Sequence, residues 1–261
     1  MDVFRTLLKT TDHRPFPPPS SAWVMKQTWR HVLFLNIPVN ADALAETLPH
    51  GLEPDTYQGQ AWLSIVPFQL AMAPRGFPNV LSETFWPIGF NELNVRTYVR
   101  LQNQPGVYFY SLDADDPFSV ASARGLFGLN YLRAKMTLTV PKDVFAESIV
   151  FKSQRRHAPY PSSLFSARYQ PESERLDVAP GSLAEWLTSR WCFFCPNKSH
   201  GFIRGDIHHE PWPLYPAKWQ IEAESLLVDH HLPAAQGEMI GYFSPKVHVL
   251  AWPPQTVCQG C

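Results

Sequence analysis

The proline content restricts this chain to folds built from short extended segments. Its 261 residues include 26 prolines, and inside a helix each proline removes a backbone donor and clashes with the preceding turn. A helical bundle does not tolerate so many, whereas strands joined by proline-rich turns do. Hydrophobic residues make up 45% of the chain and aromatic residues 13%, which suits a sizeable core and pleated surfaces. We therefore expect a mainly β fold.

Local patterns place the expected strands and helices. Apolar runs at residues 32–37 and 61–68 are typical of buried strands. Residues 94–100 alternate strictly between apolar and polar and pair with residues 106–112 as an antiparallel hairpin. The expected helices are short and lie at 41–48 behind a capping Asn40, at 116–126, and at 182–190 behind a capping box formed by Ser182 and Glu185.

Charge and hydropathy exclude two classes of partner. The net charge is -1 and the cations are scattered, so no concentrated basic face for nucleic acid is expected. The longest nearly apolar stretch, 61–73, is too short to span a bilayer. Residues 1–19 are polar and lack a secretory signal, so we expect a cytoplasmic protein. The expected organisation is a flexible leader at 1–21, one domain at 22–253 and a tail at 254–261.

Four cysteines form two CxxC pairs, Cys192 with Cys195 and Cys258 with Cys261. The gap between the pairs is far longer than in a zinc ribbon. Unlinked reduced thiols are therefore the favoured interpretation, and a metal clip is the alternative. No other spacing predicts a metal or a cofactor, and we expect neither.

Five segments carry a resemblance to a known family, and they occur in the same order along residues 23–252. They are PF at 67–68, FNELNVRTYV at 90–99, GVYF at 106–109, RAKM at 133–136 and GDIHHEPWPL at 205–214. The chain resembles the YqjF-like family of uncharacterised proteins and, more distantly, the acetoacetate decarboxylase-like β-barrel superfamily. The resemblance implies that residues 22–253 form a single antiparallel β-barrel with a few short helices and an enclosed pocket.

The superfamily resemblance also bears on chemistry. Asn91-Glu92 looks like the strand start that supplies an acidic active-site residue in acetoacetate decarboxylase. The stretch that would hold its imine-forming lysine reads GLNYL at 128–132, so Tyr131 and Leu132 stand at both lysine positions. Imine formation needs a primary amine, and Lys135 is the nearest one. A standard Schiff-base decarboxylase is therefore not expected.

The candidate site residues come from alternation and from the resemblance. Glu92, Asn94, Arg96 and Tyr98 share one strand face, which either lines the barrel interior or faces solvent. Arg133 and Lys135 share a face in the same way, and only one of the adjacent His208 and His209 can face a cavity. The candidate catalytic residues are Glu92, Arg96 and Lys135, and the candidate ligand-binding residues are Asn94, Tyr98, Tyr131, Arg133, His208, Trp212, Trp62 and Phe68.

Two functions are consistent with this site. The first is a barrel that binds a small carbonyl- or carboxylate-bearing molecule. The second is an enzyme in which Glu92 transfers a proton and Arg96 or Lys135 stabilises charge. If Glu92, Arg96 and Lys135 converge on a closed cavity, the enzyme is favoured, whereas a cavity lined by aromatic residues alone favours the binding barrel. A filled barrel interior would instead indicate an oligomeric scaffold without a pocket. The sequence leaves a homo-oligomer open.

Overall fold

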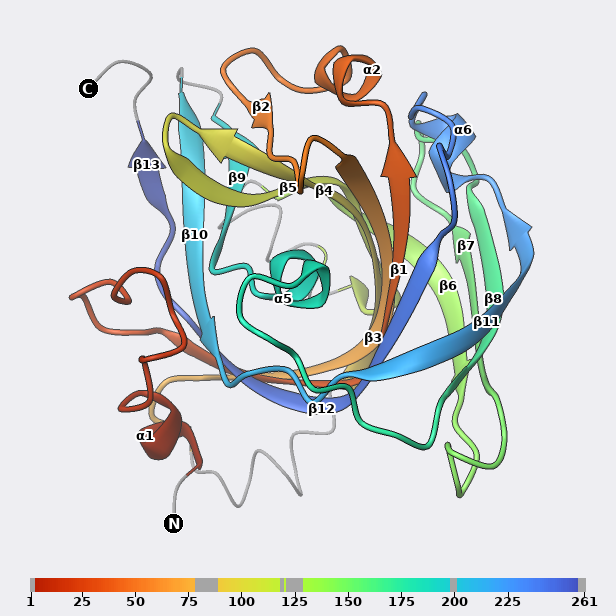
Figure 1. Ribbon diagram of the computed structural model, residues 1–261, viewed down its shortest axis with the longest axis horizontal. Helices are drawn as coiled ribbons and strands as arrows, with labels where there is room; N and C mark the ends of the chain where they lie inside the picture. The colour runs from red at the N-terminus through yellow and green to blue at the C-terminus, as the bar shows by residue number, and fades with distance from the viewer. Residues whose placement is uncertain (1–2, 78–88, 118–119, 121–128, 198–200, 258–261) are drawn as a thin grey trace.

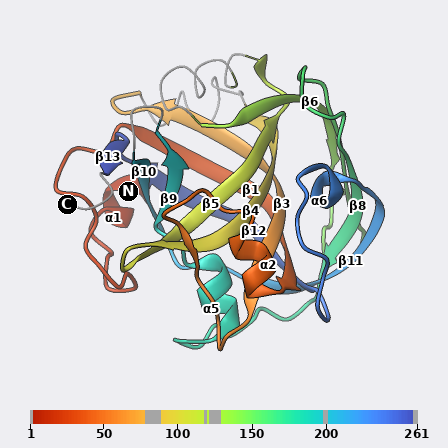
Figure 2. The ribbon, with the colours of Figure 1, turned by 90° about the horizontal axis from the view of Figure 1, so that it is seen from above.

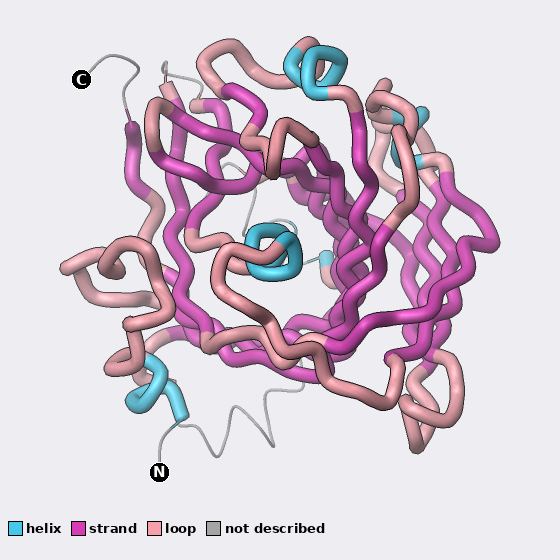
Figure 3. Tube along the Cα trace, viewed as in Figure 1, coloured by secondary structure: helices cyan, strands magenta, loops and turns pink. Residues whose placement is uncertain are grey.

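The fold is mainly β, as the sequence predicts (Figure 3). The computed structural model describes residues 3–77, 89–117, 120, 129–197 and 201–257. Its elements are α1 (Val3–Leu7), β1 (Met25–Val39), α2 (Ala41–Ala45), β2 (Glu53–Pro54), β3 (Ala61–Pro74), β4 (Gly89–Leu101), β5 (Gln104–Ala114), β6 (Tyr131–Thr139), β7 (Ile149–Arg155), β8 (Leu164–Pro171), α5 (Leu183–Thr188), β9 (Cys192–Pro196), β10 (Phe202–His209), β11 (Tyr215–Glu224), α6 (Leu226–Asp229), β12 (Ile240–Ala251) and β13 (Gln255–Val257).

The strands of the described residues form one 13-stranded sheet that closes on itself. A first ring runs β10–β9–β5–β4–β3–β1–β12 and returns to β10. A second ring runs from β5 through β6, β7, β8 and β11 to β12 and back along β1, β3 and β4. Figure 1 shows α5 inside the first ring, with β6, β7, β8 and β11 as a further layer to its right. The predicted barrel is confirmed, and the described pairings are antiparallel except β5–β6 and β5–β9.

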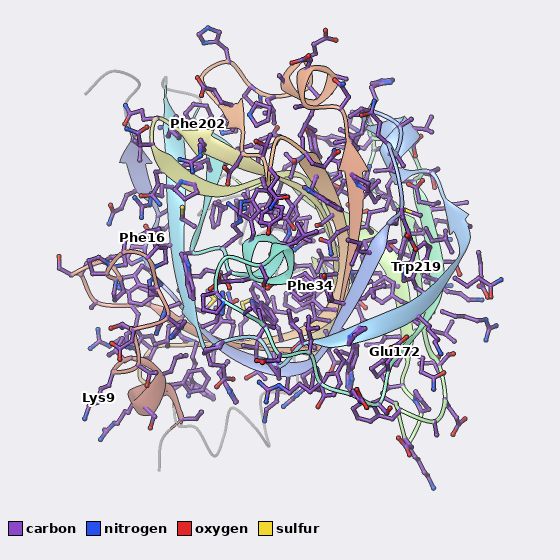
Figure 4. The ribbon with its side chains drawn as sticks, viewed as in Figure 1. Lys9, Phe16, Phe34, Glu172, Phe202 and Trp219 are labelled. Carbon is purple, nitrogen blue, oxygen red and sulfur yellow. The ribbon has the colours of Figure 1, made fainter. Side chains whose placement is uncertain are left out.

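Strands β1, β3 and β4 are shared by the two rings and are therefore buried on both faces. Along β1, Leu33 and Leu35 pack into the core inside the second ring. Val32 and Phe34 point the other way and pack inside the first ring. This double burial explains why the sequence shows continuous apolar runs here instead of alternation. Figure 4 labels Phe34, which packs in the same cluster as Ala184 of α5, and Trp219 of β11, which packs against the cluster that contains Leu33 and Leu35.

The outer strands β6, β7 and β8 have one buried face, and their sequences alternate accordingly. On β6, Ala134 and Met136 are buried in the core, while Arg133 and Lys135 are exposed. On β7, Arg155 is 1% exposed and forms an ion pair with Asp113 of β5 at 3.0 Å. This pair ties β5 to β7, and His230 lies 3.1 Å from the same guanidinium.

Helix α5 lies at one end of the first ring (Figure 2). Ser182 caps it by accepting a hydrogen bond from the Glu185 amide, as the capping pattern predicts. The returning bond differs, because the Glu185 carboxylate accepts from the Gly181 amide rather than from Ser182. The hydroxyl of Tyr98 donates to the Leu187 carbonyl at 2.8 Å and so anchors the helix to β4.

The N-terminal segment is packed, in contrast to the flexible leader that the sequence suggests. Phe4 and Leu7 of α1 are buried against Leu250 and Trp252. The guanidinium of Arg14 donates to the Ile207 carbonyl at 2.7 Å. At the other end, β13 pairs with β10, which extends the sheet into the expected tail.

The other local predictions have mixed outcomes. The helix expected at 41–48 is present as α2 and ends earlier, with Asn40 as its N-cap. The helix expected at 116–126 lies largely outside the described residues. Cys192 and Cys195 are free thiols, and Cys258 and Cys261 lie outside the described residues. Within the described ranges, no group of three or more His, Cys, Asp or Glu side chains is arranged to hold a metal ion. No helix of the same ranges is long and apolar enough to cross a membrane.

Candidate functional site

The first ring encloses a cavity of about 140 Å³. Each strand of the ring contributes at least one lining residue, and Thr188 contributes from the end of α5. The wall is largely apolar and aromatic, with a small number of polar groups. The residues used below are Trp29, Glu92, Asn94, Arg96, Phe109, Tyr131, Arg190, Phe193, His209 and Trp212. Concave, mostly apolar sites with a few placed polar groups are typical of small-molecule binding.

Strand β4 supplies the polar row of this cavity. Glu92, Asn94 and Arg96 alternate along the strand and all line the cavity. The intervening Leu93 and Val95 pack into the core inside the second ring. Because successive side chains of a strand point to opposite faces, a polar face toward the cavity and an apolar face toward the core follow from one alternating sequence.

Glu92 is a buried acid with a raised proton affinity. Its side chain is 2% exposed, and desolvation raises the pKa of its carboxyl to about 7. Tyr131 donates its hydroxyl to Glu92 Oε2 at 2.9 Å, and Asn94 also hydrogen-bonds this carboxyl. Burial together with the neighbouring carboxylate raises the pKa of Tyr131 well above its ordinary value. Glu92 therefore exchanges a proton near neutral pH, while Tyr131 stays a donor.

Arg96 is a buried cation without a carboxylate partner among the described residues. Its side chain is 6% exposed, and none of the ion pairs in the described part of the chain includes it. Its Nη2 donates to the Leu187 carbonyl at 3.4 Å, while its Nε has no hydrogen-bond partner. The guanidinium carbon lies 5.3 Å from the centre of the Phe34 ring. A buried guanidinium in this state favours an anion from outside the chain.

Arg190 and His209 also line the cavity. The sequence did not indicate Arg190, and of the two adjacent histidines it named His208 as the candidate. Arg190 follows α5 and donates Nη1 to Asp55 at 2.6 Å, while its Nη2 has no partner. Desolvation lowers the pKa of Arg190 despite this ion pair. His209 is 1% exposed and stacks on Trp191 at 4.3 Å. Desolvation lowers the pKa of His209 to about 3, so its ring is neutral.

Arg133 and Lys135 lie on the surface, contrary to the inward alternative. They share a strand face with Tyr131, yet only Tyr131 lines the cavity. The reason is the path of β6, which pairs with β5 only over Tyr131–Arg133 and then continues beside β7. The face that borders the cavity at Tyr131 therefore leaves the first ring within two residues.

The remaining predicted site residues are buried beside the cavity and do not line it. Trp62 and Tyr98 pack against α5, and Phe68 supports the wall by packing on Trp29, with ring centres 5.2 Å apart. His208 points to the opposite side of β10 from His209, where it contacts the Leu7 carbonyl at 2.9 Å. Of the two adjacent histidines, His209 is the one at the cavity. Trp212 lines the cavity as expected.

No lysine is among the described residues that line the cavity. Tyr131 occupies the wall at one expected lysine position, and Leu132, at the other, is fully buried. Neither of these two side chains carries the primary amine that imine formation requires.

The closed barrel has an acetoacetate decarboxylase-like fold. The enduracididine biosynthesis enzyme MppR, in a structure with HEPES buffer bound, superposes with a TM-score of 0.65 at 14% identity, covering 94% of this chain and 90% of that one. Acetoacetate decarboxylase from Legionella pneumophila superposes with a TM-score of 0.59 at 14% identity, covering 94% and 92%. These similarities establish the fold.

Sequence similarity identifies the family. Residues 26–248 match DUF2071, described as an uncharacterized conserved protein. The chain is also 35% identical over 236 residues to the uncharacterized protein YqjF of Bacillus subtilis, covering 90% of this chain and 93% of that protein. The chain belongs to the DUF2071 family, as the YqjF-like resemblance predicts.

Proposed function

We propose that this protein binds a small organic carboxylate inside the first ring, with the carboxylate against Arg96. The observation that carries the proposal is the buried guanidinium of Arg96, which lines the cavity with an unpartnered Nε and no carboxylate of its own. Leaving such a charge uncompensated is costly, and a ligand carboxylate would neutralise it through charge-assisted hydrogen bonds.

The size and polarity of the cavity set limits on the ligand. A volume of about 140 Å³ is close to that of an engineered cavity known to accommodate benzene, so the part of the ligand that lies inside the cavity has few heavy atoms. Arg96 and Arg190 interact electrostatically and make one part of the wall cationic. Glu92 and Tyr131 supply a protonatable group elsewhere on the wall. A carboxylate at the arginines would leave the rest of the molecule beside Glu92 and the aromatic wall.

A protein of similar fold supports the same ligand class. MppR has been solved in complex with pyruvate, and that structure superposes on this chain with a TM-score of 0.63 at 14% identity. Pyruvate is a small carboxylate, and a carboxylate is the group that Arg96 would bind in the present cavity. We extend carboxylate binding to the present chain as part of the proposal.

The test is direct binding of carboxylates of two to five carbons, measured by titration calorimetry on wild type and on Arg96→Met. Methionine keeps much of the apolar stem and removes the charge. We expect at least one acid to bind the wild type and to lose at least about tenfold in affinity in the variant, because a charge-assisted hydrogen bond is lost.

Arg133→Met is the matched control, because Arg133 is an exposed arginine outside the cavity. Its affinity for the same acid should equal that of the wild type. Equal affinities in the wild type and Arg96→Met would contradict the proposal, and so would binding confined to uncharged compounds.

A second candidate function is proton transfer by an enzyme, in which Glu92 acts on the bound acid. The observation in its favour is a buried carboxyl whose pKa is raised to about 7, within 2.9 Å of a tyrosine hydroxyl. General acids and bases work best when their pKa lies near the operating pH. Lys135 takes no part in this version because it is exposed on β6, so charge stabilisation falls to Arg96.

The enzyme candidate is tested by incubating each bound acid with the protein in deuterated water and following its α-hydrogens by NMR. We expect exchange with wild type and a loss of about 100-fold or more with Glu92→Gln. Absence of exchange for every acid that binds would leave the protein as a binding barrel.

A further inference from the structure

The cavity wall contains unpartnered hydrogen-bond acceptors as well as unpartnered donors. Among the buried side-chain atoms without a partner, four belong to cavity-lining residues: Asn94 Oδ1, Arg96 Nε, Arg190 Nη2 and His209 Nε2. All four side chains are at least nine-tenths buried. Buried polar groups are normally satisfied, so these four atoms indicate which hydrogen-bonding groups a ligand of this cavity would supply.

His209 is an acceptor at its free nitrogen. Its Nδ1 lies 2.7 Å from the Glu210 carbonyl, which can only accept, so Nδ1 carries the proton. The ring is neutral, and Nε2 is therefore a lone-pair acceptor. The backbone carbonyl of Arg190 also interacts with this ring and, like the Glu210 carbonyl, can only accept a hydrogen bond. A group that completes this part of the wall must donate a hydrogen bond.

Asn94 presents a second acceptor. Its interaction with Glu92 lowers the pKa of that carboxyl, which identifies the amide nitrogen of Asn94 as the donor to Glu92. The carbonyl oxygen Oδ1 is then the atom without a partner. Like His209, it requires a donor from the ligand.

A keto acid cannot satisfy this wall, because its carbonyl and carboxylate only accept hydrogen bonds. An amino acid would donate through its ammonium group, but that group would add a cation beside Arg96 and Arg190, and the Asp206 carboxylate in the same wall is already paired with Arg204. A hydroxyl donates without adding charge. Building on the proposed carboxylate function, we infer that the ligand is a small hydroxy acid whose carboxylate faces Arg96 and whose hydroxyl donates to His209 Nε2.

The experiment compares acids that differ only in the oxidation state of one carbon. Lactate is paired with pyruvate and 3-hydroxybutyrate with acetoacetate, each measured by titration calorimetry with the full chain, and alanine is included for the ammonium group. We expect the better hydroxy acid to bind at least about tenfold more tightly than its keto partner, because the keto partner leaves a buried acceptor unsatisfied. Alanine should bind more weakly than lactate.

His209→Phe removes the acceptor and keeps a flat ring against Trp191. We expect its hydroxy-to-keto affinity ratio to fall toward one, with the keto acid binding as in the wild type. The matched control is His208→Phe, the same change one residue earlier on the opposite side of the strand, which should keep the wild-type ratio. Circular dichroism melting of both variants confirms that each is folded.

The possible results separate the two proposals. Equal binding of hydroxy and keto acids, or a ratio unchanged in folded His209→Phe, overturns the hydroxy-acid inference and leaves carboxylate binding standing. Failure of every carboxylate to bind the wild type overturns the proposed function and this inference with it. Tighter binding of alanine than of lactate would identify an ammonium ligand and contradict the inference.

Discussion

Burial of Glu92 should make the unfolding free energy of this protein depend on pH, and the substitution Glu92→Gln should remove that contribution. Glu92→Gln replaces the carboxyl by a neutral amide of the same shape, which can still hydrogen-bond Tyr131 and Asn94. In the wild type the pKa of Glu92 rises from an ordinary value of 4.5 to about 7, chiefly because burial disfavours its charged form. The native state therefore holds a proton that the unfolded chain releases.

The sign and size of the effect follow from this difference in proton affinity. Below pH 4.5 both states are protonated, and the protonated carboxyl contributes its full stability. As the pH rises toward 7, the unfolded chain ionises while native Glu92 does not, so that stability is progressively lost and is gone above pH 7. Each tenfold difference in proton affinity is worth about 1.4 kcal/mol, which gives a loss of about 2 to 3 kcal/mol between pH 5 and pH 8.

The measurement is urea unfolding of wild type and Glu92→Gln at pH 5 and pH 8, followed by tryptophan fluorescence. The difference in unfolding free energy between the two proteins should shift by about 2 to 3 kcal/mol in favour of the variant on going to pH 8. Asp113, whose pKa burial raises to about 6, titrates in both proteins and cancels in the comparison. An equal difference at both pH values would refute the assignment of Glu92 as a desolvated acid.

Two further predictions concern packing and charge. Arg155→Met leaves the buried Asp113 carboxylate on β5 without its ion-pair partner and should cost about 3 to 5 kcal/mol of unfolding free energy. Arg168→Met, at an exposed ion pair, should cost about 1 kcal/mol or less. Similar urea midpoints for the two variants would contradict this prediction. Gly205→Ala drives a methyl group into the Phe193 ring and should cost about 1 to 3 kcal/mol, while at Gly89 the nearest atom lies 3.5 Å away and alanine should leave the melting temperature almost unchanged.

Most of the fold could be predicted because its signals are local. Proline content excluded a helical bundle, and alternation identified the antiparallel β4–β5 hairpin, although not the register shift between Val95 and Arg96. The capping residues of α2 and α5 were also readable, since a cap involves neighbours in the chain. The packing of the N-terminal segment was not predictable, because Arg14 finds its partners on β10, almost 200 positions further along.

The candidate site was predicted in part for the same reason. Glu92, Asn94 and Arg96 lie on one strand, so their common face followed from spacing. Arg190 and His209 reach the cavity from two other segments, and no local pattern marks them. For the two adjacent histidines, alternation showed that only one could face a cavity, but not which one.

The sequence by itself determined which side chains share a face, because a strand has a fixed period of two residues. Only the tertiary structure decided what each face meets. Ring closure turned the polar face of β4 inward to the cavity, and the departure of β6 from β5 put Tyr131 in the wall while Lys135 went to the surface. Spacing is a property of the chain, whereas inside and outside exist only once distant strands have paired into a closed sheet.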